Sequence, residues 1–405
     1  MSTKPPSQCD VIINGAGLIG SSCALALART GMTVVVLEKR PAFQSPPEQP
    51  TRVSSINHAS QNILAHLDVW PDIATEALNV FERIEVWDAL SQGTISFDAA
   101  TVGLTHLGHI VSNNSICAAL HHALNACPNV TMFFGESPAE ITPSESDVAV
   151  TLNTKGKLRA RLLIGADGAL SIVRQLSGIA QQESSYDHTA IVATVTPEHP
   201  HGVCARQRFL PSGPLAFLPL ANNQCSIVWS ATLDRADHLL SLDDGAFAFE
   251  LAEAFDHRLG RIDEVSKRVG FALVRRHASD YIGQRIALIG DAAHTVHPLA
   301  GLGANQGFAD AAALAQVASA AYLQNRDFAT RAVLRRYERW RRGENALVLQ
   351  LMDGFHALFG SESPTMTGLR ATGLNLTDQT PLLKNALMRY AIGLAGDIPQ
   401  MARAL

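Results

Sequence analysis

Short apolar runs, separated by glycine turns or by stretches of helical periodicity, dominate the first part of the chain. Residues 10–13 and 33–37 are continuous apolar runs typical of buried strands. Between them, residues 21–30 are rich in alanine and leucine and are followed by Gly31, which is typical of a helix and its end. This succession predicts a βαβ unit built on a parallel sheet.

Periodicity along the rest of the chain predicts both strands and helices. The predicted helices lie at residues 54–67, 110–127, near 246–255, at 303–323 and beyond 334. The predicted strands lie within 81–97, at 148–152 and 158–164, within 189–275, and at 285–289. A mostly β layer is therefore expected inside an α/β nucleotide fold, followed by a helical tail.

The chain has 405 residues, a length that favours about two domains. We expect an α/β fold: a doubly wound, Rossmann-like domain with an inserted, mostly β substrate domain and a helical C-terminal segment. The nucleotide-binding domain is predicted to be discontinuous, over residues 1–75, 104–185 and 276–330. The substrate domain would take residues 76–103 and 186–275, and the C-terminal helical segment residues 331–405.

Composition narrows the class of protein. Apolar residues make up 47% and charged residues 17%, as in globular enzymes, and a net charge of -5 argues against a nucleic-acid partner. Six scattered cysteines form no CxxC pair and no zinc-ligand spacing, so no metal site is expected and the thiols are expected to be reduced. The N-terminus lacks the pattern of a signal peptide, and no run of 18 apolar residues occurs, so we expect a cytoplasmic protein.

The first chemical motif is the GAGLIG segment, residues 15–20. Gly15 permits a tight turn, Gly17 lets the backbone approach a pyrophosphate, and Gly20 allows close packing of the helix on the strand. Glu38 ends the second predicted strand, where a carboxylate hydrogen-bonds a ribose 2′-hydroxyl and repels a 2′-phosphate. The motif therefore predicts bound FAD or NAD rather than NADP; the alternative is a purely structural glycine turn.

Two further segments place a carboxylate after a predicted strand. Asp167 and Gly168 follow the strand at 158–164, where an Asp-Gly pair is in most proteins only a turn. Asp291 follows the strand at 285–289 and could bind sugar-like hydroxyls. Beyond it, a glycine-rich loop leads into a helix near Ala304 and Asn305, whose N-terminus would stabilise negative charge on a reduced flavin.

In this order and at these separations, the three motifs resemble the flavoprotein aromatic hydroxylases with one dinucleotide-binding domain. More narrowly, the chain resembles the bacterial ubiquinone-biosynthesis hydroxylases, above all those that act on 2-polyprenylphenols at ring carbon 5 (position 6 in older schemes). The segments that carry the narrower resemblance are 52–70, 85–100, 107–116, 215–230, 290–301 and 335–355. They cover nearly the whole chain.

The resemblance implies FAD as cofactor and a role for particular residues. It assigns the ADP half of FAD and its surroundings to Gly15, Gly17, Gly20, Glu38, Lys39 and Arg52, the last near the pyrophosphate. It places Asn113 near the flavin, Asp167 at the cleft shared with the nicotinamide, Asp291 at the ribityl chain, and Pro298, Gly301, Gly303, Ala304 and Asn305 along the isoalloxazine ring. The sequence departs from the family at Leu302, where a glutamine is usual, and at Ser112, where an acid is usual.

The implied reaction is ring hydroxylation. NAD(P)H, bound transiently, would reduce FAD; molecular oxygen would form a C4a-hydroperoxide; and the distal hydroxyl would pass to a carbon ortho to a phenol. The catalytic region would comprise His297, Pro298, Gly301 and Gly303. His294 and His297 either move protons there or are packed, hydrogen-bonded structural residues, and the structural interpretation is favoured.

Several features have two interpretations. Arg206 and Arg208 anchor an anionic substrate or are solvated charges on a sheet face. The segments 215–220 and 228–229 line a pocket for a prenylated ring or form core, and 382–394 admits a lipid tail or caps the flavin domain. The basic residues of the tail either form a solvated helix face or dock on an anionic membrane or partner proteins: Arg331, Arg335, Arg336, Arg339, Arg341 and Arg342.

Other functions compete with hydroxylation of a polyprenylated phenol or quinone precursor. Three other kinds of enzyme use the same scaffold: a hydroxylase of another ring position or of a small aromatic, a flavin reductase, and a halogenase. The four isolated tryptophans do not fit a halogenase motif. A flavin-binding scaffold in a multiprotein ubiquinone-synthesis assembly is a non-enzymatic alternative. For the protein itself, a peripheral position at the inner membrane face stays open beside the cytoplasmic one. The sequence does not specify an oligomeric state, and a homo-oligomer stays open.

Overall fold

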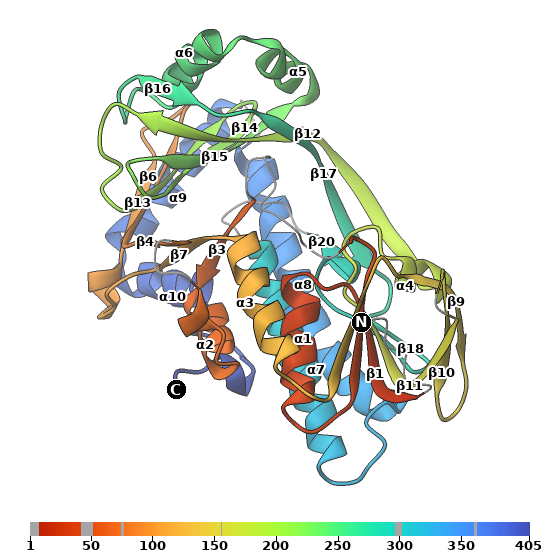
Figure 1. Cartoon of the computed structure of the whole chain (residues 1–405). Coiled ribbons are helices and arrows are strands. Elements are labelled where there is room, and N and C mark those ends of the chain that lie inside the picture. The colour runs from red at the N-terminus through yellow and green to blue at the C-terminus, as the bar shows by residue number, and fades with distance from the viewer. Residues whose placement is uncertain (1–7, 42–51, 74–76, 155, 296–301, 360–362) are drawn as a thin grey trace.

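The computed structural model describes residues 8–41, 52–73, 77–154, 156–295, 302–359 and 363–405 (Figure 1). The described chain folds into three sheets with helices between and around them. Of the residues singled out from the sequence, His297, Pro298 and Gly301 lie outside the described residues.

The first sheet is largely parallel and has the strand order β18-β19-β11-β1-β2-β8, with β10 paired antiparallel to β11 and β9 paired antiparallel to β10. Its strands are β1 (Cys9–Asn14), β2 (Val34–Glu38), β8 (Val130–Phe134), β9 (Pro138–Pro143), β10 (Val148–Leu152), β11 (Lys157–Gly165), β18 (Ile282–Gly283) and β19 (Ile286–Leu288). The helices α1 (Leu18–Ala28), α3 (Asn113–Asn125) and α7 (Leu302–Tyr322) pack side by side, with α1 in the middle. The largest hydrophobic core lies among these helices and the sheet.

The second sheet has nine strands in the order β20-β17-β12-β15-β14-β13-β5-β6, with β16 paired to β12. Its strands are β5 (Arg83–Asp88), β6 (Thr94–Asp98), β12 (Gln181–Pro197), β13 (Cys204–Leu210), β14 (Gly213–Pro219), β15 (Cys225–Thr232), β16 (Ile262–Val265), β17 (Val269–Ala278) and β20 (His294–Thr295). The helices α5 (Leu233–Ser241) and α6 (Asp244–Ala254) close a separate core on this sheet. Figure 1 shows β12 and β17 as long strands that reach from this sheet toward the first.

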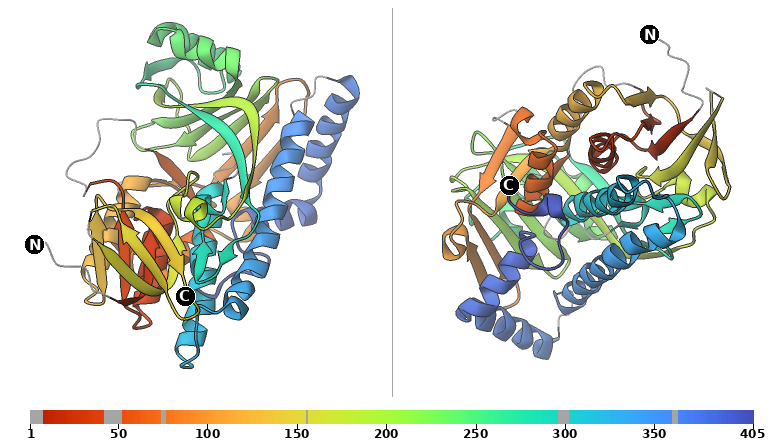
Figure 2. Two further views of the ribbon diagram at one scale, coloured as in Figure 1. Left: turned by 90° about the vertical axis from the view of Figure 1, so that its right-hand side faces the viewer. Right: turned by 90° about the horizontal axis from the view of Figure 1, so that it is seen from below.

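A third, small sheet of order β3-β7-β4 lies between the other two (Figure 1). It comprises β3 (Val53–Asn57), β4 (Leu78–Phe81) and β7 (Gly108–Ser112), and α2 (His58–His66) follows β3 directly. The remaining helices are α4 (Ile172–Leu176), α8 (Arg331–Phe359), α9 (Pro364–Gln379) and α10 (Pro381–Ala391), with short 3₁₀ turns at Trp70–Asp72, Ala99–Val102, Gly290–Ala292 and Gln400–Ala402. The C-terminal helices lie along one side of the molecule (Figure 2).

The predicted α/β architecture is confirmed, with a Rossmann-like sheet, a β-rich second sheet and C-terminal helices. Two predicted helices began too early. Residues 54–67 and 110–127 each start with a strand, β3 and β7, and these strands pair with one another from Val53↔Ser112 to Asn57↔Gly108. These residues form strands because pairing with a distant strand overrides the helical spacing of the local sequence. Each helix then begins at a side-chain cap, in which Asn57 accepts from the Ser60 backbone N–H and Ser112 from that of Ser115.

The predicted domain boundaries at 185/186 and 275/276 fall within β12 and β17, two strands that continue through both regions. The division into domains therefore stays a prediction. Over the described part of the chain, the helices are all too short or too polar to cross a bilayer.

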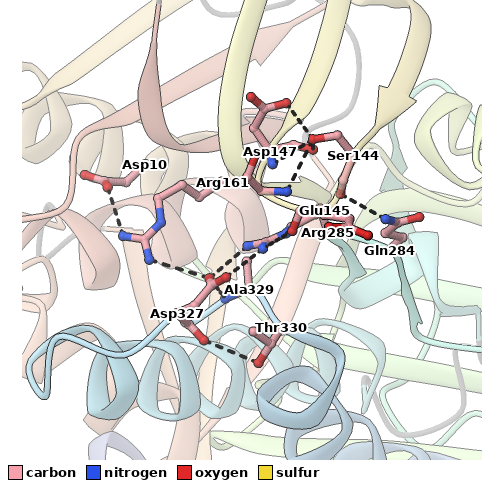
Figure 3. Close-up of polar contacts among 11 residues, drawn as sticks. Asp10, Ser144, Glu145, Asp147, Arg161, Gln284, Arg285, Asp327, Ala329 and Thr330 are labelled. Atoms are coloured by element: carbon pink, nitrogen blue, oxygen red, sulfur yellow. Dashed lines mark hydrogen bonds and ion pairs between the residues drawn. The ribbon is translucent and has the colours of Figure 1, made fainter.

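A cluster of ion pairs fastens the amino ends of the parallel strands (Figure 3). Arg285, just before β19, is 7% exposed and donates to both carboxylate oxygens of Asp327, at 2.8 and 2.6 Å, and to the carbonyl of Glu145. Arg161 of β11 lies 3.5 Å from Asp327 and 3.8 Å from Asp10 of β1. These contacts hold three loops to one edge of the sheet: the loop between β9 and β10, the loop before β19 and the loop after α7.

We predict that Arg285→Ala lowers the free energy of unfolding by about 3 kcal/mol, because the buried end of the cluster loses its cation and Asp327 loses two hydrogen bonds. Chemical denaturation measures this change. Arg326→Ala is the matched control, since Arg326 is exposed and its side chain bonds only the nearby Gln324. Equal stability of the two variants would contradict the prediction.

Candidate active site

The carboxyl ends of four neighbouring parallel strands meet at one edge of the first sheet. In the order β2-β1-β11-β19, the register pairs Leu37 with Asn14, Asn14 with Gly165, and Gly165 with Leu288. Glu38, the glycine turn, Asp167 and Asp291 follow these ends, within roughly 15 Å along the edge, given strands about 4.8 Å apart. In open α/β sheets this is the edge at which ligands bind.

The glycine turn between β1 and α1 has no room for a β-carbon at Gly15 or Gly20 but is open at Gly17. Gly15 adopts φ +112°, and a β-carbon there would lie 2.3 Å from the carbonyl oxygen of Ala166. A β-carbon on Gly20 would lie 1.9 Å from the carbonyl oxygen of Gly15, whereas one on Gly17 would meet nothing within 4 Å. Among the described residues no side chain caps α1 at Gly17, so the start of this helix is available to a pyrophosphate.

Glu38 is bound to the same turn. Its Oε2 accepts from the Ala16 backbone N–H at 2.9 Å, and its Oε1 accepts from the backbone N–H and the Nε of Arg40, both at 3.0 Å. Burial raises the pKa of this carboxyl, but the hydrogen bonds from Arg40 and Ala16 outweigh burial and leave the pKa below its ordinary value. Glu38 is therefore a carboxylate at the end of β2, while Lys39 beside it is exposed.

Asp167 has a structural position. Its carboxylate accepts from Asn14 Nδ2 at 2.8 Å, from Ser171 Oγ at 2.5 Å, and from the Ile172 and Val173 backbone N–H groups at 2.7 and 3.3 Å. These four donors join the end of β1 to the start of α4. This geometry supports the turn interpretation; a contact of Asp167 with a nicotinamide stays a prediction.

Asp291 lies in the 3₁₀ turn that follows β19. Its side chain is exposed to solvent, yet surrounding protein raises the pKa of its carboxyl, although His294, Arg52 and Arg276 act in the opposite direction. Arg52 reaches this region from the start of β3, and its guanidinium lies 5.0 Å from the centre of the Phe271 ring on β17. A carboxyl that is both surrounded and accessible is suited to bind hydroxyl groups of a ligand.

Asn113 follows β7 and lies next to Arg52. Its backbone N–H donates to the Arg52 carbonyl at 2.9 Å, and its Oδ1 accepts from Ser54 Oγ at 2.7 Å. The structure thus brings Arg52 and Asn113 together, and its electrostatics place Arg52 near Asp291.

The N-terminal turn of α7 is fixed by Asn305. This side chain is 7% exposed, accepts from the Asn57 backbone N–H at 3.1 Å and Ser60 Oγ at 2.7 Å, and donates to the Ser55 carbonyl at 2.7 Å. Its amide therefore bonds β3 and α2 and fixes the direction in which α7 starts. Gly303 and Ala304 lie in the same first turn and are half-buried.

Gly307, which the sequence reasoning missed, lets α7 approach α1. A β-carbon there would lie 2.7 Å from two side-chain carbons of Ile19, so a larger residue would push the helices apart. The sequence signal for this contact is a glycine one turn inside a predicted helix. Glycine destabilises a helix interior, so its presence there indicates a packing requirement.

A buried polar network behind the Asp291 turn was also missed. Asp310 of α7 is fully buried and accepts from the Gly290 backbone N–H at 3.1 Å, and its carboxylate lies 2.6 Å from His294 Nε2 and 2.8 Å from Arg341 Nε. Asn345, one turn beyond Arg341 on α8, donates to the same carboxylate at 3.1 Å. From the other side, the buried Arg174 donates to the Ala292 carbonyl at 3.1 Å.

This network decides two of the earlier alternatives. His294 is a packed, hydrogen-bonded residue, so the structural interpretation is confirmed for it. The solvated-helix interpretation of the tail is wrong for Arg341, which is 4% exposed, while the other tail arginines are exposed. Burial raises the pKa of Asp310, but His294 and Arg341 outweigh burial and hold it at about 2. The sequence signal for this buried network was Asp310, an acidic residue inside an alanine-rich predicted helix.

Arg206 and Arg208 are largely buried, and both have partners within the protein. Arg206 pairs with Glu85 of β5 at 2.9 Å, and Arg208 donates to the carbonyls of Glu253 and Ala254 at the end of α6. Trp229 is core, 1% exposed. The solvated-charge interpretation is thus wrong for both arginines, because a neighbouring strand and a helix end bind them, while the anchoring of a substrate stays a prediction.

Comparison with known proteins identifies the family. Residues 8–351 match the model of an FAD-binding domain. The 3-demethoxyubiquinol 3-hydroxylase of Escherichia coli (strain K12) is 35% identical over 394 residues, 97% of this chain and 100% of that one. The human mitochondrial ubiquinone biosynthesis monooxygenase COQ6 is 34% identical, over 94% of this chain and 92% of its own. The chain belongs to the ubiquinone-hydroxylase family of FAD-dependent monooxygenases.

A solved structure shares the fold of this chain. The crystal structure of p-nitrophenol 4-monooxygenase PnpA from Pseudomonas putida DLL-E4 has a TM-score of 0.77 at 19% identity, covering 97% of this chain and 100% of that chain. The similarity to PnpA shows the fold, while the matched FAD-binding model and the curated relatives confirm the expected family, FAD cofactor and hydroxylase class. The glycine turn, the uncapped start of α1 and the placed carboxylates fit FAD.

We predict that Gly17→Ala and Gly20→Ala separate ligand binding from folding. Gly17→Ala should fold normally and lose at least about tenfold in FAD affinity, because its methyl group occupies the space left for the pyrophosphate. Gly20→Ala should destabilise the apoprotein as well, because its methyl group meets the Gly15 carbonyl. Flavin fluorescence titration and thermal unfolding of the apoprotein measure the two effects. Full FAD affinity in Gly17→Ala would contradict the assignment of this turn.

We predict that Asp310→Asn lowers the free energy of unfolding by about 3 kcal/mol at neutral pH, because Arg341 is left buried without its carboxylate. Since the folded-state pKa of Asp310 is about 2, below the ordinary 3.8, its stabilisation is complete above about pH 4 and is lost as the pH falls through 2. Denaturant unfolding at several pH values should therefore show a shallower acid slope in the variant. The exposed Asp280→Asn should unfold like the parent, and an unchanged slope in Asp310→Asn would refute the account.

Proposed function

We propose that this flavin monooxygenase hydroxylates the aromatic ring of a polyprenylated phenol in ubiquinone biosynthesis, at ring carbon 5 (6 in older schemes), with NAD(P)H as reductant. The observation that carries the proposal is the near full-length similarity to relatives named as ubiquinone hydroxylases, among them ubiquinone hydroxylase UbiL of Rhodospirillum rubrum at 34% identity over 98% of this chain. Bound FAD would supply electron transfer and oxygen activation.

The second sheet offers an apolar face for such a substrate. Along β14 the side chains alternate, so that Leu215 and Phe217 enter the core beneath α5 and α6, while Ala216 and Leu218 are half-buried on the opposite face. Val228 pairs with Ala216 on that face. Leu218 packs toward the small sheet and α10, and apolar surface there suits a hydrophobic ring and tail.

The residues at the carboxyl edge of the first sheet have distinct proposed roles. Gly15, Gly17, Gly20 and Glu38 would hold the ADP half of the cofactor, with Arg52 beside the pyrophosphate. Asp291 would bind the ribityl hydroxyls, and the first turn of α7 would direct its N–H groups at the flavin. Asn305 and Asp310 would be positioning residues, since they are buried and fix α7 and the Asp291 turn through hydrogen bonds within the protein.

A second ring position has one specific observation in its favour. The Escherichia coli relative at 35% identity is named as a 3-hydroxylase of demethoxyubiquinol, so ring carbon 3 is the alternative to carbon 5. Mass spectrometry and NMR of the product formed from prenylated phenols decide between them. A product hydroxylated only at another carbon would reject the position and keep the enzyme class.

We predict that Asp291→Ala reduces substrate-dependent oxygen uptake by at least about tenfold, because the ribityl chain loses its acceptor. Asp291→Asn is the matched variant, since its amide still hydrogen-bonds hydroxyls and should retain more of the activity. Bound FAD is quantified in both. Complete rescue of ubiquinone synthesis by Asp291→Ala in a strain lacking the gene, without oxygen uptake, would instead favour a scaffold role in a multiprotein assembly.

A further inference from the structure

The strands β13, β14 and β15 present two different faces. Their pairing is unbroken, so successive side chains alternate between the faces and paired residues share a face. One face packs beneath α5 and α6, where Arg206 pairs with Glu85 and Arg208 donates to carbonyls at the end of α6. Gln207 lies between the two arginines and therefore points to the other face, toward the small sheet and α8 (Figure 1).

The row of side chains that contains Gln207 is otherwise apolar. On one side Gln207 pairs with Ala216 of β14, which in turn pairs with Val228 of β15. On the other side it pairs with Val86 of β5. The amide of Gln207 is therefore a single polar group in a row of small and branched apolar side chains.

Two apolar clusters lie on either side of this row. Two residues before Gln207, Ala205 belongs to the cluster formed with the small sheet and α10. Two residues after it, Phe209 belongs to the cluster formed with α8 and α9. Gln207 belongs to neither cluster and keeps part of its surface accessible, as do Ala216 and Val228. The row is thus the accessible part of an otherwise covered apolar face.

Gln207 is the polar group of this face that a ligand can reach. The other polar residues that β13, β14 and β15 place there, up to residue 230, are Ser226 and Ser230, which are only 3% and 2% exposed. Among the described residues, none hydrogen-bonds the side-chain amide of Gln207, whereas Arg206 and Arg208 beside it are both bound. A half-buried amide without a partner is unfavourable until a ligand binds it, and such groups orient ligands in apolar sites.

We propose that the Gln207 side chain binds the phenol hydroxyl of the substrate and makes the enzyme specific for a hydroxylated ring. The hydroxyl donates to Oε1 of Gln207, and the ring and the first part of the prenyl tail lie against Ala216, Val228 and Leu218. A neutral amide binds a phenol without placing a charge on an apolar surface. This inference rests on the proposed function and deepens it, because a ring held by its hydroxyl has a fixed orientation of its other carbons.

Binding of 2-geranylphenol and of geranylbenzene, which lacks the hydroxyl, to the full-length, FAD-loaded protein tests the proposal. The change in flavin absorbance on addition of each compound reports binding. The wild type should bind the phenol at least about tenfold more tightly than geranylbenzene, because only the phenol donates to Oε1. Gln207→Met keeps the length of the side chain without the amide and should reduce this preference to less than about threefold. The matched control Gln182→Met removes an exposed amide from β12 and should keep the full preference.

Steady-state kinetics give a second readout, which loss of stability alone would not produce. Gln207→Met should raise the KM for 2-geranylphenol by at least about tenfold and should oxidise more NAD(P)H per hydroxylated product, because the ring is no longer held in one orientation. Circular dichroism and FAD content show that each variant is folded. Gln207→Leu has the same expected results and replaces Gln207→Met if that variant loses FAD.

Four results would overturn the proposal: a wild type that binds neither compound, one that binds both equally, full preference for the phenol in Gln207→Met, or loss of that preference in Ser226→Ala alone. The binding measurement needs no turnover, so its outcome is separate from that of the proposed function. A preference that depends on Gln207, without hydroxylation of any prenylated phenol, would reject the proposed function alone. Hydroxylation of prenylated phenols with an unchanged preference in Gln207→Met would reject the role of Gln207 alone.

Discussion

Where β1, α1 and β11 meet at the glycine turn, there is no room for a β-carbon on Gly15 or Gly20. The site is built around this close contact. The backbone of Gly15 lies against Ala166, and Gly20 lies against Gly15, so α1 starts as close to the sheet as a helix can. Gly307 repeats the constraint between α1 and α7. Both helices therefore begin near the carboxyl edge of the sheet, where their N–H groups are available to an anionic or flat, electron-rich ligand.

A buried carboxylate transmits this arrangement to the rest of the molecule. Asp310 joins the Asp291 turn, α7 and α8 through Gly290, His294 and Arg341, and none of these contacts reaches solvent. Because an unpaired charge is costly in such a place, the turn, the two helices and β20 have one mutual arrangement. The ion pairs around Asp327 serve the opposite edge, so the architecture and the ligand edge are stabilised by separate sets of contacts.

Sequence reasoning found what local patterns encode. Spacing alone predicted the βαβ unit with its residues Gly15, Gly17, Gly20 and Glu38. Continuous apolar runs predicted the strands before Asp167 and Asp291. The starts of α2 and α3 were wrong because β3 and β7 stabilise one another across 50 residues, which no local window contains. Asp310 and Arg341 were missed for a related reason, since a charge on a helix is buried or solvated according to what packs on it. The burial of Arg370 on α9 depends likewise on Asp88, which lies far away in sequence.

Hydrogen–deuterium exchange of the apoprotein, with and without added FAD, tests most directly whether the flavin occupies the carboxyl edge of the first sheet. The account predicts new protection in the backbone of residues 14–20, 38–40, 290–293 and 303–305, and none around Arg285 and Asp327 at the amino edge. Protection confined to other parts of the chain, or none on saturation with FAD, would contradict it.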